Sequence, residues 1–163
     1  MSQMLDELWA ARAPNLPLAD KQQAVILASI VERETALPAE RPHIAAVFEN
    51  RLRLHMKLES DPTVIFAVTK GEGGFDRPIT RADLDLSSPY NTYLNEGLPP
   101  GPIGNPGRAS IEAVLHPAAS DDLYFVADGS GGHVFAKTLA QHQKNVERWR
   151  QIEKSQVNGQ GGG

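Results

Sequence analysis

The chain has 163 residues, a formal net charge of −4 and no cysteine, and 40% of its residues are hydrophobic. This length fits a single domain with a substantial core, and the weak negative charge disfavours nucleic acid or an anionic lipid surface as a partner. The lack of cysteine excludes disulfides, thiol nucleophiles and thiolate metal sites. No stretch reaches the ~20 apolar residues of a membrane span. Because the N-terminus has the pattern of a domain helix and not that of a signal peptide, we interpret Met1 as a start inside a longer natural protein.

The first half of the chain is predicted to be helical. Apolar residues recur at helical spacing in four segments, residues 2–12, 21–35, 39–56 and 60–68. Asp20 can cap the second of these helices. Either Ser60 or Asp61 could cap the fourth, with Pro62 in its first turn, where the missing N–H of proline does no harm.

The middle of the chain is rich in proline and glycine. Residues 70–78 are expected to form a flexible loop, and residues 86–107 form a second, longer one. A loop of this length inside a compact domain is usually either disordered or functional. Because Tyr90, Tyr93 and Ile103 are poor components of a solvated linker, the pattern favours a shaped, functional loop.

The last third is predicted to contain a helix, a β-hairpin and a final helix. These elements are expected at residues 107–116, 121–128 with 133–137, and 139–154. Thr138 and Gln141 have the spacing of a capping box for the final helix. We therefore expect one mostly helical α+β domain over residues 1–157, followed by a flexible tail over residues 158–163.

Two glutamates near the end of the helix predicted over residues 21–35 lie among apolar neighbours. On a helical wheel, Glu34 falls between Leu27 and Ile30, inside the apolar arc, whereas Glu32 falls beside Val25 and closer to the polar gap. Desolvation raises the pKa of a carboxyl group, and a raised pKa suits a general acid near neutral pH. The alternative is a pair of exposed charges at the end of a surface helix.

Three longer stretches resemble the endolytic murein transglycosylases of the YceG-like (MltG) family. They are residues 27–68, 88–107 and 116–146, which include the sequences "VERET", "SPYNTYLNEGLPPGPIGNPG" and "DDLYFVADGSGGHVFAK". The resemblance implies an enzyme that cleaves peptidoglycan strands internally, between N-acetylmuramic acid and N-acetylglucosamine. It also implies that the muramyl 6-hydroxyl attacks its own anomeric carbon and leaves a 1,6-anhydro end. The active site is then expected in a lysozyme-like cleft.

The resemblance also implies roles for residues of the "VERET" sequence. The essential glutamate of the family maps onto Glu34, which would act first as general acid and then as base. Thr35 matches a glutamate–hydroxyl pairing seen in lysozyme-like lytic enzymes and is a candidate substrate contact. Glu32 is the fallback acid and another candidate contact.

The "YNTY" sequence of the long loop offers further candidate substrate contacts. Tyr90 and Tyr93 have aromatic faces for sugar rings, although they could instead pack the loop onto the core. Asn91 and Thr92 are the favoured substrate contacts of this segment, because an amide and a hydroxyl can bind acetamido groups.

The roles of three other polar residues stay open. Asp61 is expected mainly to cap a helix, and lining the cleft is the second role considered for it. The same two roles are open for Ser60. His133 is expected to be structural more than cleft-lining. No histidine pair has the spacing of helical metal ligands, so no metal and no other cofactor is expected.

The sequence is also compatible with two other functions. One is a peptidoglycan-binding module with little activity without a missing N-terminal region, and the other is an ordinary muramidase in which Asp61 activates water. The resemblance further implies cell-wall synthases as candidate partners and a missing N-terminal membrane anchor. It places the protein at the periplasmic face of the inner membrane.

Overall fold

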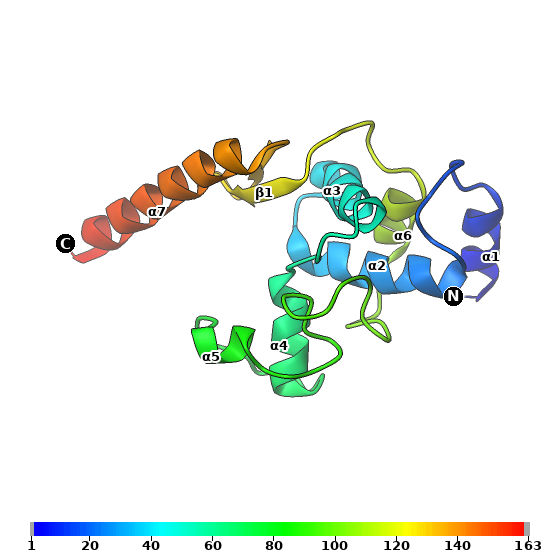
Figure 1. The fold of residues 1–163 in the computed structure, drawn as a ribbon, viewed down its shortest axis with the longest axis horizontal. Helices are drawn as coiled ribbons and strands as arrows, with labels where there is room; N and C mark the ends of the chain where they lie inside the picture. Colours follow the sequence, from blue (N-terminus) through cyan, green and yellow to red (C-terminus); the bar gives the residue numbers. More distant parts are fainter. Residues whose placement is uncertain (1, 162–163) are drawn as a thin grey trace.

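The computed structural model describes residues 2–161, which form one mostly helical domain with a small β-hairpin, as the sequence predicts (Figure 1). In chain order the elements are α1 (Ser2–Ala10), α2 (Lys21–Glu34), the 3₁₀ turn η1 (Pro38–Glu40), α3 (Arg41–Arg53), α4 (Asp61–Thr69), α5 (Arg81–Leu84), α6 (Arg108–Leu115), β1 (Tyr124–Ala127), β2 (His133–Ala136) and α7 (Leu139–Gly161).

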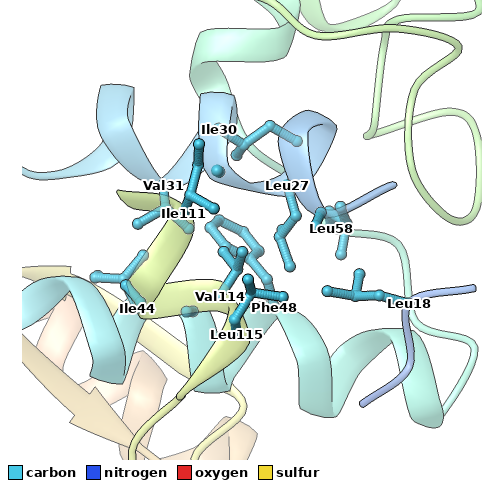
Figure 2. Packing of buried hydrophobic residues seen from close by; sticks show 14 of the residues in the cluster. Leu18, Leu27, Ile30, Val31, Ile44, Phe48, Leu58, Ile111, Val114 and Leu115 are labelled. Carbon is cyan, nitrogen blue, oxygen red and sulfur yellow. The ribbon is translucent and has the colours of Figure 1, made fainter. Parts of the chain in front are cut away.

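The core forms where α2, α3 and α6 pack together. Figure 2 shows Leu27 of α2, Phe48 of α3 and Ile111 of α6 among the side chains that meet there, all of them buried. Helix α2 also contacts α1 and α4, so it has neighbours on most of its sides. This arrangement explains why the sequence of α2 is apolar almost all round, since each side must bury surface against a different partner.

Helix α2 begins where the sequence predicts it. The side chain of Asp20 caps the helix by accepting a hydrogen bond from the N–H of Gln23, at 2.9 Å. The helix ends at Glu34, and Thr35 continues the chain in an extended conformation. The candidate acid is therefore the last residue of a helix that packs against α1, α3, α4 and α6.

The long loop over residues 86–107 is packed against the helices. Ile103 is buried, and its N–H donates to the hydroxyl of Ser29 on α2, at 3.0 Å. The sequence missed one element just before this loop, the short helix α5, which is capped by Thr80 and Asp83 through reciprocal hydrogen bonds. The prediction of a shaped loop agrees with these contacts.

The hairpin and the last helix form the other end of the domain. Strands β1 and β2 are antiparallel, with Phe125 opposite Phe135, and the strands are shorter than predicted. Helix α7 packs on the hairpin and then extends away from the helical body (Figure 1). Thr138 accepts from the N–H of Gln141, but the Gln141 side chain donates to Asn145 and not back to the cap.

Helix α7 is longer than the sequence indicates. It continues from the predicted end near residue 154 to Gly161, and so includes part of the segment expected to be a flexible tail. Residues 162–163 of that segment lie outside the described residues. Within residues 2–161, no helix is long and apolar enough to cross a membrane.

Candidate active site

A pocket of about 340 Å³ opens between the helical body and the hairpin, and Glu34 lines it. The other lining residues come from α3, the segment before α4, the start of α4, the long loop, the hairpin and α7; they are Arg51, Leu58, Glu59, Asp61, Tyr93, Phe125, Val126, Ala127, His133, His142 and Trp149. The pocket therefore has the end of α2 on one side and the hairpin with α7 on the other.

Glu34 is half-buried, so its carboxyl group is mostly surrounded by protein but stays accessible from the pocket. Its Oε1 accepts a hydrogen bond from the hydroxyl of Ser60, at 2.7 Å. The pKa of Glu34 is raised to about 7. Burial is the main cause, the hydrogen bond from Ser60 works against it, and the charge of Asp61 adds a smaller increase. A carboxyl group with this pKa is substantially protonated near neutral pH and can donate its proton.

Ser60 is held in place by two buried threonines. Its N–H donates to Oγ1 of Thr92, at 2.9 Å, and its carbonyl accepts from Oγ1 of Thr63, at 2.7 Å. The two threonine hydroxyls lie 2.8 Å apart, and because Thr63 gives its proton to Ser60, Thr92 is the donor of that pair. The substrate contact of Thr92 stays a prediction; in the structure this buried residue positions the serine that binds Glu34.

Asn91 is completely buried and does not reach the pocket. Its side-chain amide donates to the carbonyls of Leu84 and Leu86, both at 2.9 Å, and its Oδ1 accepts from the N–H of Tyr93. Substrate binding by Asn91 stays a prediction; in the structure its hydrogen-bonding groups bind backbone groups of residues 84–93. It fixes the loop conformation that brings Tyr93 to the pocket.

The two tyrosines of the loop have different roles. Tyr90 packs on Phe66 with a distance of 4.7 Å between the ring centroids, so the core-packing alternative holds for it. Tyr93 lines the pocket, and its hydroxyl donates to Oδ1 of Asp61, at 2.6 Å. Burial, followed by the hydrogen bond to Asp61 and nearby negative charges, raises the pKa of Tyr93 far above its ordinary value. Tyr93 therefore remains a neutral donor.

The expected helix cap at Asp61 is wrong. Ser60 occupies the cap position of α4, its side chain binds Glu34 in place of the helix, and Pro62 lies in the first turn as predicted. Asp61 is exposed and lines the pocket beside Tyr93. The second of the two roles considered for Asp61 is the one that the structure shows.

Glu32 and Thr35 lie outside the pocket lining. The carboxylate of Glu32 accepts from the N–H of Gly107, at 3.2 Å, and from the hydroxyl of Ser110, at 2.7 Å, at the start of α6, where a helix favours negative charge. The hydroxyl of Thr35 donates to Glu40, at 3.0 Å. The two substrate contacts stay predictions, and in this structure the side chains of Glu32 and Thr35 bind other parts of the protein.

Several pocket residues were missed by the sequence analysis. Arg51 is buried; its guanidinium donates to the carbonyls of Leu123 and Lys57 and lies over the ring of Tyr124. His142 and Trp149 come from α7, and their place beside Glu34 depends on how the hairpin docks. Of these residues, only Arg51 could have been found from the sequence, because this charged residue interrupts the buried side of the helix predicted over residues 39–56.

His133 combines the two roles considered for it. Its Nδ1 lies 2.8 Å from Oε1 of Glu40, and the ring also lines the pocket. Among residues 2–161, no group of three or more histidine, aspartate or glutamate side chains is arranged to hold a metal ion.

Comparison with known proteins identifies the family. The YceG-like family model matches residues 1–148. An endolytic murein transglycosylase of Bacillus subtilis (strain 168) is 49% identical over 123 residues, which are 76% of this chain and 33% of that protein. An endolytic murein transglycosylase of Streptococcus pneumoniae (strain ATCC BAA-255 / R6) is 36% identical over 158 residues, which are 88% of this chain and 28% of that protein.

A solved structure agrees with these relatives. The crystal structure of a Listeria monocytogenes protein described as YceG-like superposes with a TM-score of 0.70 and 40% identity, and the match covers 88% of this chain and 42% of that one. The chain spans about a third of the length of the relatives it matches. With a family model that covers nearly the whole chain, this protein belongs to the YceG-like family.

Proposed function

We propose that this chain is the catalytic part of an endolytic lytic transglycosylase that cleaves peptidoglycan between N-acetylmuramic acid and N-acetylglucosamine. The observation that carries the proposal is the carboxyl group of Glu34, which lines an open pocket and whose pKa of about 7 keeps much of it neutral. The names of the relatives support this substrate class, because those proteins are endolytic murein transglycosylases.

In the proposed reaction, Glu34 acts twice. It first gives its proton to the glycosidic oxygen, and the bond between that oxygen and the anomeric carbon of the muramyl residue breaks. The positive charge that develops on the sugar can be stabilised by its own acetamido group. The muramyl 6-hydroxyl then bonds to the anomeric carbon, and its proton passes to the Glu34 carboxylate. Glu34 ends the cycle protonated, and the product carries a 1,6-anhydro end.

Ser60 suits both halves of this cycle. Its hydroxyl donates to Oε1 of Glu34, so this bond becomes stronger when Glu34 is a carboxylate. The attacking hydroxyl belongs to the substrate, and an intramolecular nucleophile can have an effective concentration of order 10⁵ M or more. One carboxyl group of the protein is then sufficient, whereas ordinary glycosidases need two.

A hydrolase is the second candidate, because Asp61 lines the same pocket as Glu34. In that reaction Asp61 would activate a water molecule or act as nucleophile. The hydrogen bond from Tyr93 to Oδ1 of Asp61 disfavours this, since it ties up one oxygen of the carboxylate and makes it a weaker base.

Mass spectrometry of digested peptidoglycan tests the proposal. Purified sacculi incubated with the chain should yield fragments with 1,6-anhydro-muramyl ends. These fragments are lighter than hydrolysis products by the mass of one water molecule, about 18 Da. Reducing muramyl ends would support the hydrolase, and binding without cleavage would support a peptidoglycan-binding module. Glu34→Gln should abolish product formation, and Glu32→Gln is the matched control that should retain it.

The cellular setting is proposed on the same basis. A peptidoglycan substrate implies action in the cell envelope. The finer proposal is a location at the periplasmic face of the inner membrane, with a membrane anchor outside this chain. Cell-wall synthases are then the partners whose new strands this activity would cut.

A further inference from the structure

A buried glutamate holds a histidine against the pocket at two points. Oε2 of Glu40 accepts from the backbone N–H of His133, at 2.7 Å, and Oε1 of Glu40 lies 2.8 Å from Nδ1 of the His133 ring. The side chains of both residues are largely buried, with 15% and 17% of their surface exposed for His133 and Glu40. The ring also makes an edge contact with Phe125, which lines the pocket too.

The same glutamate ties this histidine to the segment that carries the proposed acid. Oε1 of Glu40 accepts from the hydroxyl of Thr35, the residue after Glu34, at 3.0 Å. A chain of side-chain hydrogen bonds therefore runs from the end of α2 through Glu40 to His133 on β2. It fixes the two sides of the pocket relative to one another.

The contact with Glu40 determines which nitrogen of the ring carries the proton. Although burial pushes the pKa of Glu40 upward, the hydrogen bonds from His133 and Thr35 outweigh it and hold the pKa below its ordinary value. A carboxylate only accepts, so Nδ1 of His133 must donate to it. On a neutral ring, Nε2 then has a free lone pair and acts as an acceptor.

Nε2 is the polar atom that this ring can offer to a ligand. It has no hydrogen-bond partner among residues 2–161, and His133 is one of the residues that line the pocket with Glu34. The close fit extends to the preceding residue: a Cβ atom on Gly132 would lie 2.9 Å from Oε2 of Glu40, so a larger residue there would displace this carboxylate. These contacts orient the imidazole before any ligand binds.

We propose that His133, oriented by Glu40, is a substrate-binding residue that accepts a hydrogen bond at Nε2 from a hydroxyl or acetamide N–H of the bound glycan. The inference rests on the proposed function, because it takes the glycan to occupy the pocket beside Glu34. It deepens that function by assigning the hairpin side of the pocket to substrate orientation, opposite the side that supplies the proton.

Two substitutions separate binding from structure. In His133→Asn, the amide can replace Nδ1 in the bond to Glu40 but does not reach the position of Nε2. In His133→Gln, the longer side chain can place its carbonyl oxygen near that position. The parent protein is Glu34→Gln, which should bind glycan without cutting it, and the probe is a muramyl-containing oligosaccharide measured by calorimetry at one fixed pH.

We expect His133→Asn to weaken binding about fivefold, as for the loss of one neutral hydrogen bond, and His133→Gln to retain most of the affinity. The thermal midpoint of His133→Asn should remain that of the parent. The opposite order, with Asn binding like the parent and Gln binding less well, would show a purely structural histidine and overturn the proposal. Equal affinities in all three proteins would overturn it as well.

A second measurement uses the parent protein alone and so does not depend on how the variants fold. The ¹⁵N resonance of His133 Nε2 should shift when the oligosaccharide is added, and a resonance that stays in place while the glycan binds contradicts the proposal. If the Glu34→Gln parent binds no glycan at all, it is the proposed function that fails, and this inference falls with it.

Discussion

Replacing Glu34 by glutamine should show separately how much stability the raised pKa of Glu34 costs and how much this residue contributes to turnover. Glutamine has the same shape and can still accept the hydrogen bond from Ser60, but it carries neither the proton nor the negative charge. We expect turnover to fall by on the order of 10²–10⁴-fold, as for the loss of a general acid. We also expect the variant to be more stable than the wild type at alkaline pH, because an ionised carboxyl group in this pocket is poorly solvated.

The size of this gain follows from the two pKa values of Glu34. The pKa is about 7 in the folded chain against 4.5 for an unperturbed glutamate, a difference worth about 3 kcal/mol. Below 4.5 both the folded and the unfolded states are protonated, so Glu34 adds no pH dependence. Between 4.5 and about 7 the unfolded state ionises first, and the wild type loses stability as pH rises. Above about 7 the loss is complete, and Glu34→Gln should unfold roughly 6–12 °C higher than the wild type.

The assay is urea unfolding of both proteins at a series of pH values, with the difference in free energy of unfolding plotted against pH. Other titrating groups are present in both proteins and largely cancel in the difference. Glu32→Gln is the matched control, because it removes the same charge two residues away. Its amide oxygen can still accept from Gly107 and Ser110, but these bonds lose their negatively charged acceptor at the start of α6, so the variant should be less stable than the wild type. A difference between Glu34→Gln and wild type that does not change with pH would refute the raised pKa and, with it, the role of Glu34 as a neutral acid.

Three further variants probe groups around and behind the site. Ser60→Ala removes the hydrogen bond that lowers the pKa of Glu34, so the alkaline limb of the profile of kcat/KM against pH should move to higher pH; an unmoved limb would contradict the assigned contact. Glu49 is fully buried with no hydrogen-bond partner among the described residues, and its pKa is raised to about 8, mainly by burial. The wild type should therefore lose stability as pH rises from about 4.5 to about 8. Above that range, Glu49→Leu should have a free energy of unfolding in urea higher than that of the wild type by on the order of 5 kcal/mol, whereas near pH 4 the gain should be small. An equal gain at both pH values would argue against ionisation as the cause. Asn91→Ala leaves two carbonyls and an N–H without partners and should cost about 2–4 kcal/mol in the same assay, and a loss below about 1 kcal/mol would mean that the loop is held by other contacts.

The position of Glu34 could be predicted from the sequence because it depends on a local, periodic pattern. Its neighbours on α2 are apolar at helical spacing, and the helix begins at the predicted cap, Asp20. The wheel therefore placed Glu34 and Glu32 on different sides, and in the structure the first faces the pocket and the second faces α6. Periodicity is sufficient when the residue lies on a long helix with a clear start.

The roles of Asn91 and Thr92 could not be predicted in this way. Their loop has no period, and their burial depends on partners that no repeating pattern specifies. The carbonyl of Leu84 lies seven residues from Asn91, and the N–H of Ser60 lies 32 residues from Thr92. A polar side chain in such a loop satisfies buried backbone groups as readily as it binds a ligand. The sequence alone does not separate the two outcomes.

The hairpin side of the pocket could be predicted from the sequence only in part, for a different reason. The strands around the glycine-rich turn were predicted, but the docking of the hairpin beside Glu34 depends on tertiary contacts. Among these are the bonds of Glu40 to His133 and the stacking of His43 on Phe135, with 3.5 Å between the ring centroids. Trp149 reaches the pocket only because α7 follows the hairpin.

The sharing of Glu40 by Thr35 and His133 also determines where the chain tolerates engineering. Inserting a residue between 34 and 40 would change the spacing between the end of α2 and η1 and pull the hairpin away from its anchor. The turn around Gly73 and Gly74 has open space on its outer side, so a fluorescent label or a fused peptide is better accommodated there. A reporter at that turn would leave the geometry around Glu34 intact.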